Sequence, residues 1–88
     1  MAWTIELLPQ AAKELKAIDR TAAARIIRTL EQRIATLDDP RMLGAALTGD
    51  HAGYWRWRIG DCWMAARIED ERITILVVRV AHRQEVYR

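Results

Sequence analysis

Residues 73–80, Ile-Thr-Ile-Leu-Val-Val-Arg-Val, form the stretch that most constrains the fold of this chain. A short, mainly apolar and β-branched run that follows turn-forming residues is typical of a buried β-strand. The next residues, 81–88, include a His, two Arg and a Tyr. Because a strand is a rigid element, we expect these side chains to be held in a defined place. The chain has 88 residues, which are too few to bury all of them.

The N-terminal half of the sequence predicts one strand and two helices. Residues 2–7 alternate between apolar and polar, which indicates a half-buried strand, and Pro9 suits the first turn of a helix. An apolar stripe follows as far as Ile18. A second helix is expected from about residue 22 to residue 37, because its apolar residues recur every three or four positions. Residues 38–40, Asp-Asp-Pro, end this helix.

The C-terminal half predicts three strands. They cover residues 54–59, 62–68 and 73–80, with turns at residues 60–61 and 69–72 and a loop at residues 41–53. The fold class is therefore α+β with the order βααβββ, in which two N-terminal helices pack on one face of a small, mostly antiparallel twisted sheet. We expect residues 1–88 to form a single domain.

The alternation within the strands assigns their side chains to two faces. Trp55, Trp57 and Ile59 are expected to pack under the helices, whereas Arg56 and Arg58, with Tyr54, point to the opposite face. Two arginines side by side suit a phosphate clamp, although two isolated arginines are also typical of an ordinary solvated face. The next strand places Trp63, Ala65 and Arg67 on one face, and the sequence leaves open whether that face is the one with Arg56.

Composition favours some functions over others. Twelve of the fourteen basic residues are Arg, the residue best suited to bidentate phosphate contacts and to stacking on bases. One cysteine, Cys62, excludes an internal disulfide, and the Cys and His spacing matches no zinc site, so neither a metal nor a cofactor is expected. The sequence has no apolar run of membrane-spanning length and no signal peptide, which predicts a cytoplasmic protein without membrane association.

Four motifs give the chain a resemblance to the RelE/ParE toxin superfamily of toxin–antitoxin systems. A first strand leads into a helical pair that starts at Pro9, and Asp39-Pro40-Arg41 follows the second helix. Leu47-Thr48-Gly49 precedes Trp55-Arg56-Trp57-Arg58-Ile59-Gly60-Asp61. The sequence ends on His82-Arg83-Gln84-Glu85-Val86-Tyr87, which looks like the RelE branch because it keeps both an Arg and a Tyr.

The resemblance implies a toxin of a type II system, and three activities remain open. RelE-like members are ribosome-dependent endoribonucleases that cut mRNA, and this is the expected activity. ParE-like members instead inhibit DNA gyrase, and a degenerate member would only bind its antitoxin. In each case the expected partner is a cognate antitoxin, through which alone the chain would reach DNA. The tryptophans and the apolar helix surface are candidates for that interface, although Trp55 and Trp57 are expected in the core.

The resemblance also assigns the site residues. Arg56 and Arg58 match basic residues at the scissile phosphate. Arg83 matches one that supports the transition state or the leaving oxygen, and Tyr87 matches an aromatic residue near the reacting nucleotide. His82 falls beside them as a candidate RNA contact, or alternatively as a strand-end histidine bonded to backbone. Trp63 stands where relatives carry a phosphate-binding Arg; it can stack on an RNA base or form an apolar patch that a partner covers.

The expected chemistry is metal-independent attack of a ribose 2′-hydroxyl on the adjacent phosphate, which gives a 2′,3′-cyclic phosphate and a 5′-hydroxyl. Arginines supply the stabilisation of charge, which is usually the largest contribution to catalysis. General acid–base catalysis is weaker, because an unperturbed Tyr has a pKa near ~10. The free protein is therefore expected to be a poor nuclease that depends on the ribosome to orient mRNA.

Overall fold

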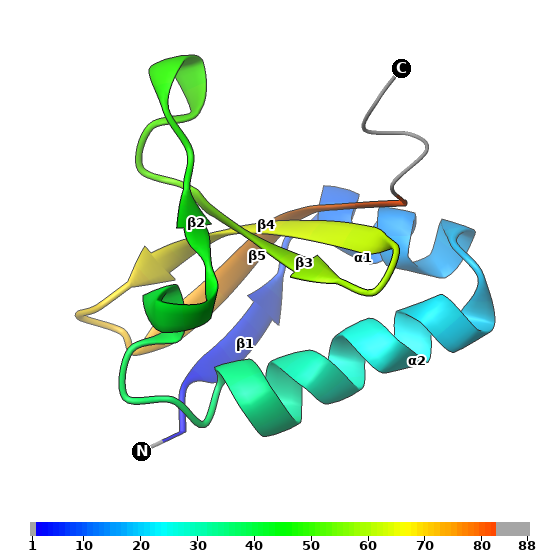
Figure 1. The fold of residues 1–88 in the computed structure, drawn as a ribbon, viewed down its shortest axis with the longest axis horizontal. Helices are drawn as coiled ribbons and strands as arrows, with labels where there is room; N and C mark the ends of the chain where they lie inside the picture. The colour runs from blue at the N-terminus through cyan, green and yellow to red at the C-terminus, as the bar shows by residue number, and fades with distance from the viewer. Residues whose placement is uncertain (1, 83–88) are drawn as a thin grey trace.

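The computed structural model describes residues 2–82, which form a five-stranded sheet with two helices (Figure 1). The strand order is β1-β5-β4-β3-β2. Neighbouring strands are antiparallel except for β1 and β5, which run parallel. The strands are β1 Thr4–Leu7, β2 Ala45–Ala46, β3 Trp55–Ile59, β4 Cys62–Glu69 and β5 Thr74–His82. The predicted α+β fold with a mostly antiparallel sheet is confirmed.

The two helices lie between β1 and the rest of the sheet in sequence. Helix α1, Pro9–Ala17, begins at the proline that the sequence pointed to, and helix α2 covers Arg20–Thr29. The Asp19 carboxylate caps α2, because it accepts hydrogen bonds from the backbone N–H groups of Thr21 and Ala22 at 3.1 and 3.2 Å. The second helix thus starts about two residues before the predicted position.

Helix α2 continues into a π-helical turn, Leu30–Ile34, and ends before the predicted residue 37. The N–H of Ala35 donates to the carbonyl of Leu30, five residues earlier, at 2.8 Å. This wider turn rotates the last residues of the helix relative to an α-helix. Leu30, Ile34 and Ala35 are all buried.

The hydrophobic core lies between the helices and one face of the sheet. Trp57 is 2% exposed, and Ile26 and Leu30 of the α2 region are buried in the same cluster, together with Ile59, Met64, Ala66, Ile75, Val77 and Val80. The prediction that Trp57 and Ile59 pack under the helices is confirmed, and Trp55 packs partly buried against the same cluster.

The predicted loop at residues 41–53 contains more structure than its sequence indicated. It includes the 3₁₀ turns Pro40–Leu43 and Gly49–His51 and the strand β2, which pairs with β3. A two-residue strand is too short to show alternation in a sequence. The first turn covers Trp57: the carbonyl of Pro40 accepts the indole N–H at 3.1 Å, and a Cβ on Gly44 would lie only 2.8 Å from the indole.

An irregularity in the β4–β5 pairing changes the faces of β5. Ala65 pairs with Arg79, whereas the next residue, Ala66, pairs with Val77, so the register skips Val78. A bulge of this kind adds one residue to one strand and breaks the alternation of side chains. Ile75 and Val77 therefore face the core, and beyond the bulge Val80 does so as well, while Arg79 is exposed on the outer face.

Candidate functional site

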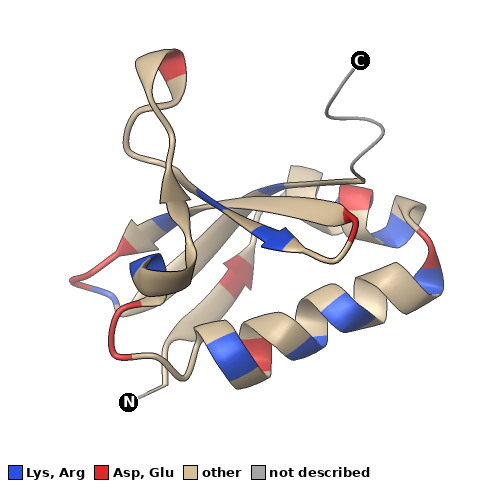
Figure 2. Cartoon of the chain, viewed as in Figure 1, with Lys and Arg blue, Asp and Glu red and all other residues tan. Residues whose placement is uncertain are grey.

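Figure 2 marks the basic residues along the backbone in blue, including those of the strands. On β3 the basic residues alternate with core residues, so their side chains lie on the outer face of the sheet, turned away from the helices. Arg56 and Arg58 are both exposed and alternate with the buried Trp57. The register pairs Arg56 with Ala65 and Arg58 with Trp63. Directly opposite residues share a face, so the structure answers the question that the sequence left open: Trp63 lies beside the two arginines.

The indole of Trp63 contacts both arginine side chains. The Arg56 guanidinium carbon lies 4.5 Å from the centre of the ring, and that of Arg58 lies 5.9 Å from it. Both distances are within the range of a cation–π interaction. Trp63 therefore holds two like charges close together on one face, a role that its apolar character alone did not indicate.

The turn between β3 and β4 lies at the end of the cluster of Arg56, Arg58 and Trp63. Gly60 has a φ of 60°, which suits the first position of a two-residue hairpin turn, where a side chain would be strained. Its carbonyl accepts a long hydrogen bond, 3.4 Å, from Nε of Arg58. A Cβ on Gly60 would also meet the Arg25 guanidinium from α2 at 3.0 Å. The positive φ therefore favours glycine here, whereas the flexible end of the Arg25 side chain can shift to make room for a Cβ.

Sequence reasoning missed one arginine of this face, Arg79. It lies across the sheet from Arg56, and together with Arg56, Trp63 and the small residues Ala65 and Ala81 it lines a pocket of about 280 Å³. Alternation counted from Ile75 and Val77 would place residue 79 on the core side. Only the bulge, which the sequence does not reveal, brings Arg79 to the outer face.

Glu14 of α1 binds both the Arg79 side chain and a backbone N–H group of β5. Its Oε2 accepts from Nε of Arg79 and its Oε1 from the backbone N–H of Val80, both at 2.8 Å. Pairing with β1 ends at Val77, so the carboxylate satisfies a backbone group on an uncovered strand edge. Burial raises the pKa of Glu14, but hydrogen bonds from Val80, Gln10 and Arg79 outweigh it, and the net pKa is lowered.

The predicted RNA contact His82 lies elsewhere. It is half-buried, pairs with the buried Cys62 and lines a separate pocket between the start of α2 and the β3–β4 turn, with Asp19, Arg25 and Asp61. The structure therefore does not bring His82 to the face with Arg56 and Trp63. Arg83 and Tyr87, the other two predicted site residues, lie outside the described residues.

Among residues 2–82, no three His, Cys, Asp or Glu side chains are grouped so that they could hold a metal ion. None of the helices described in the structure is long and apolar enough to cross a membrane.

Comparison with known proteins agrees with these features. Residues 5–87 match the family model described as the ParE toxin of the type II toxin–antitoxin system parDE. The chain belongs to this toxin family. Toxin RelG from Mycobacterium tuberculosis is 26% identical over 88 residues, which are 100% of this chain and 99% of RelG. The expected membership of the RelE/ParE superfamily is thus confirmed.

Solved structures share the fold. The toxin–antitoxin complex RelBE2 from Mycobacterium tuberculosis contains a chain that superimposes with a TM-score of 0.86 at 24% identity, covering 94% of this toxin and 93% of that chain. The isolated toxin RelE from E. coli superimposes with a TM-score of 0.71 at 18% identity, covering 98% and 92%. At these identities the likeness concerns the fold.

Proposed function

We propose that this toxin is a ribosome-dependent endoribonuclease that cuts mRNA. The observation that carries the proposal is the cluster of Arg56, Arg58 and Trp63 on the open face of a rigid sheet, with guanidinium carbons at 4.5 and 5.9 Å from the indole. Grouped arginines on secondary structure suit a phosphate that gains charge during a reaction. Activity on ribosomes would place the protein in the cytoplasm.

The proposed reaction uses the ribose 2′-hydroxyl as the nucleophile. Its oxygen gives up its proton to solvent and forms a bond to the adjacent phosphorus while the bond to the 5′-oxygen breaks. The 5′-oxygen takes up a proton from solvent, so a 2′,3′-cyclic phosphate and a 5′-hydroxyl result. Arg56 and Arg58 stabilise the extra negative charge on the phosphorus oxygens, and Arg83 supports the leaving oxygen. Tyr87 lies near the reacting nucleotide. The ribosome holds the mRNA for in-line attack, which accounts for a large part of the rate.

A cognate antitoxin is the proposed protein partner. The support is the family itself and the solved complexes of its fold neighbours with antitoxins, RelBE2 from Mycobacterium tuberculosis and RelBE from E. coli. An antitoxin segment that folds on binding repays its ordering cost with a large interface. Trp57 is not available to it, because it is buried in the core, whereas Trp55 packs partly buried against the core.

The test is induction of the toxin alone in a bacterial host, with primer extension on a translated reporter mRNA. Breaks at fixed codon positions that vanish when translation is blocked are the expected result. Arg83→Ala should abolish both growth arrest and breaks while the purified variant keeps the wild-type melting temperature. Growth arrest without breaks would refute the nuclease.

Inhibition of DNA gyrase is the second candidate. Trp63 favours it, because an indole replaces the charge-assisted phosphate contact that an Arg would make at this position, and the matching family model is that of ParE. A supercoiling assay with purified gyrase separates the two functions. Inhibition at toxin concentrations that leave translated mRNA intact would establish this second function in place of the first.

A further inference from the structure

Two rows of side chains cross the outer face of the central strands. In one row Arg56 of β3, Ala65 of β4 and Arg79 of β5 lie directly opposite one another. In the next row Arg58, Trp63 and Ala81 do the same. The backbones of β3 and β5 are two strand spacings, about 10 Å, apart. In the first row the cationic side chains of Arg56 and Arg79 therefore lie on either side of the methyl group of Ala65. The indole of Trp63 lies in the next row.

The pocket between these side chains is small and open to one side. Its volume of about 280 Å³ lies just below the range of about 300–1,000 Å³ that is usual for ligand sites. Its floor is apolar, from Ala65 and Ala81, and its walls carry positive charge, from Arg56 and Arg79. An anion with a flat apolar part fits this combination, whereas a simple ion would leave the apolar floor uncovered.

The Arg79 side chain is oriented before any ligand binds. Its Nε donates to Glu14 at 2.8 Å, and its side chain remains 64% exposed. Among the described residues its two terminal nitrogens have no hydrogen-bond partner. The Glu14 carboxylate is shared with the N–H of Val80 and the amide of Gln10, so it does not neutralise Arg79 alone. A tethered guanidinium loses less entropy when it binds a phosphate.

We propose that this pocket binds one unpaired nucleotide of a single-stranded RNA. Arg79 and Arg56 hold its phosphate from two sides, and its base covers Ala65 and Ala81 against the edge of Trp63. Arg79 is thus a substrate-binding residue, brought to the site by the bulge in β5 and set by Glu14. The inference rests on the proposed RNA substrate, but it concerns binding and does not require that the RNA is cut.

Binding is measured as fluorescence anisotropy of a short 5′-labelled single-stranded RNA with the purified toxin, over a series of salt concentrations. Arg79→Gln should weaken binding about tenfold, as expected for one charge-assisted contact. It should also lower the slope of log affinity against log salt by about 0.7, the value for one phosphate contact on a single strand. Ala65→Leu fills the floor without a change of charge and should weaken binding to a similar degree.

Matched controls separate the pocket from general charge and bulk. Arg67→Gln removes an exposed arginine of the same face outside the pocket, and Ala24→Leu adds the same bulk on an exposed position of α2; each should change affinity less than twofold. Equal losses for Arg67→Gln and Arg79→Gln, or an Ala65→Leu variant that binds normally, would overturn the proposal.

The source of the anion is tested in the same assay. Polyglutamate that displaces the RNA from the wild type, but no longer from Arg79→Gln, would show an acidic peptide site and overturn the nucleotide assignment. If the wild type cuts mRNA in cells and Arg79→Gln and Ala65→Leu bind and cut as well as it does, the pocket proposal fails and the nuclease stands. If the wild type binds RNA through Arg79 without cutting mRNA in cells, the nuclease proposal fails and the pocket stands.

Discussion

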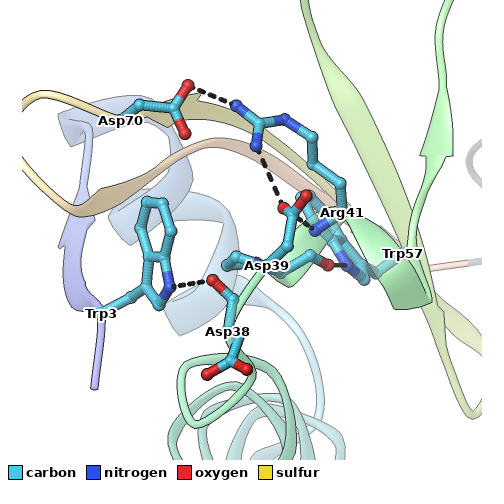
Figure 3. Close-up of polar contacts among 7 residues, drawn as sticks. Trp3, Asp38, Asp39, Arg41, Trp57 and Asp70 are labelled. Atoms are coloured by element: carbon cyan, nitrogen blue, oxygen red, sulfur yellow. Dashed lines mark hydrogen bonds and ion pairs between the residues drawn. The ribbon is translucent and has the colours of Figure 1, made fainter. Parts of the chain in front are cut away.

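Arginine and tryptophan occur together in two regions of this molecule, with opposite surroundings. In the first, the Arg41 guanidinium binds the carboxylates of Asp39 and Asp70 at 3.0 and 2.6 Å, next to the buried Trp57 (Figure 3). In the second, Arg56 and Arg58 lie against the indole ring of Trp63, and Arg58 also donates a hydrogen bond to the carbonyl of Gly60. The first region uses its charge within the protein, and the second leaves its charge available to a ligand.

The difference shows how to tell structural from functional arginines. Hydrogen bonds to Asp70 outweigh the effect of burial and raise the pKa of Arg41, and the pair ties the turn before β2 to the turn between β4 and β5. A cation already bound to two carboxylates has little left for a phosphate. A cation on an indole keeps its N–H donors for other groups. This contrast supports a role of Arg41 in the fold and the proposed role of the β3 arginines in the site.

The largest expected difference between the two regions is in stability, when the tryptophan of each region is replaced separately by alanine. Trp57→Ala leaves a cavity in the core and an unpaired carbonyl at Pro40, and should cost about 3–5 kcal/mol of unfolding free energy. Trp63→Ala, on the outer face, should cost less than about 1 kcal/mol. Urea unfolding of both variants measures this difference. Equal losses would show that Trp63 is part of the core and would remove the contrast between the regions.

The second-largest effect should be on the cleavage of mRNA. Arg56→Ala should lower mRNA cleavage about 10²–10³-fold, the usual loss when one group that stabilises developing charge is removed. Arg41→Ala is the matched control on the other region and should leave cleavage per folded molecule unchanged. Both are read as band intensities in primer extension after expression is equalised. Loss of cleavage in Arg41→Ala with normal folding would refute the assignment of that arginine to the fold.

A smaller effect on stability is expected from Arg41→Ala itself. Asp39 and Asp70 are partly exposed, so solvent screens the pairs, and the loss should be about 1 kcal/mol. High salt should reduce the difference between variant and wild type, because it screens the same charges. The comparison is a thermal melt of each protein at low and at high salt, and a difference that grows with salt would exclude the ion pairs as its cause.

The smallest effect should be the dependence of stability on pH through Glu14. Its pKa is lowered in the folded protein, so its contribution is present above the ordinary value of 4.5 and is lost as the pH falls through the lowered value. Glu14→Gln should therefore be less stable than the wild type at pH 6, and the gap should shrink toward pH 3. Urea midpoints along this pH range measure it. A gap that is constant with pH would show that the charge of Glu14 is not involved.

The sequence predicted what depends on local pattern. The strands β1, β3, β4 and β5, both helices and the exposed face of β3 with Arg56 and Arg58 followed from alternation and from helical spacing. The β3–β4 register could not be predicted from the sequence, because it depends on how the two strands pair. The bulge at Val78 was not accessible for the same reason, and with it the position of Arg79 was missed. The placement of Glu14 against β5 joins residues that are 66 positions apart.

His82 shows the same limit from the other side. The motif at the end of the sequence made it a candidate RNA contact beside the basic site residues. The structure turns His82 toward Cys62 and the start of α2, where its pocket contains Asp19 and Arg25. A residue named from its place in a motif therefore lies away from the face with Arg56 and Trp63.

The position of β5 in the sheet has a consequence for the timing of toxicity. This strand lies between β1 and β4, yet residues 1–73 are synthesised before it. Until β5 leaves the ribosome, β1 has no neighbouring strand and one edge of β4 is unpaired, so the complete sheet cannot form. Long-range pairing of this kind makes folding late and cooperative. A ribosome that makes this chain has thus translated most of it before the basic face exists.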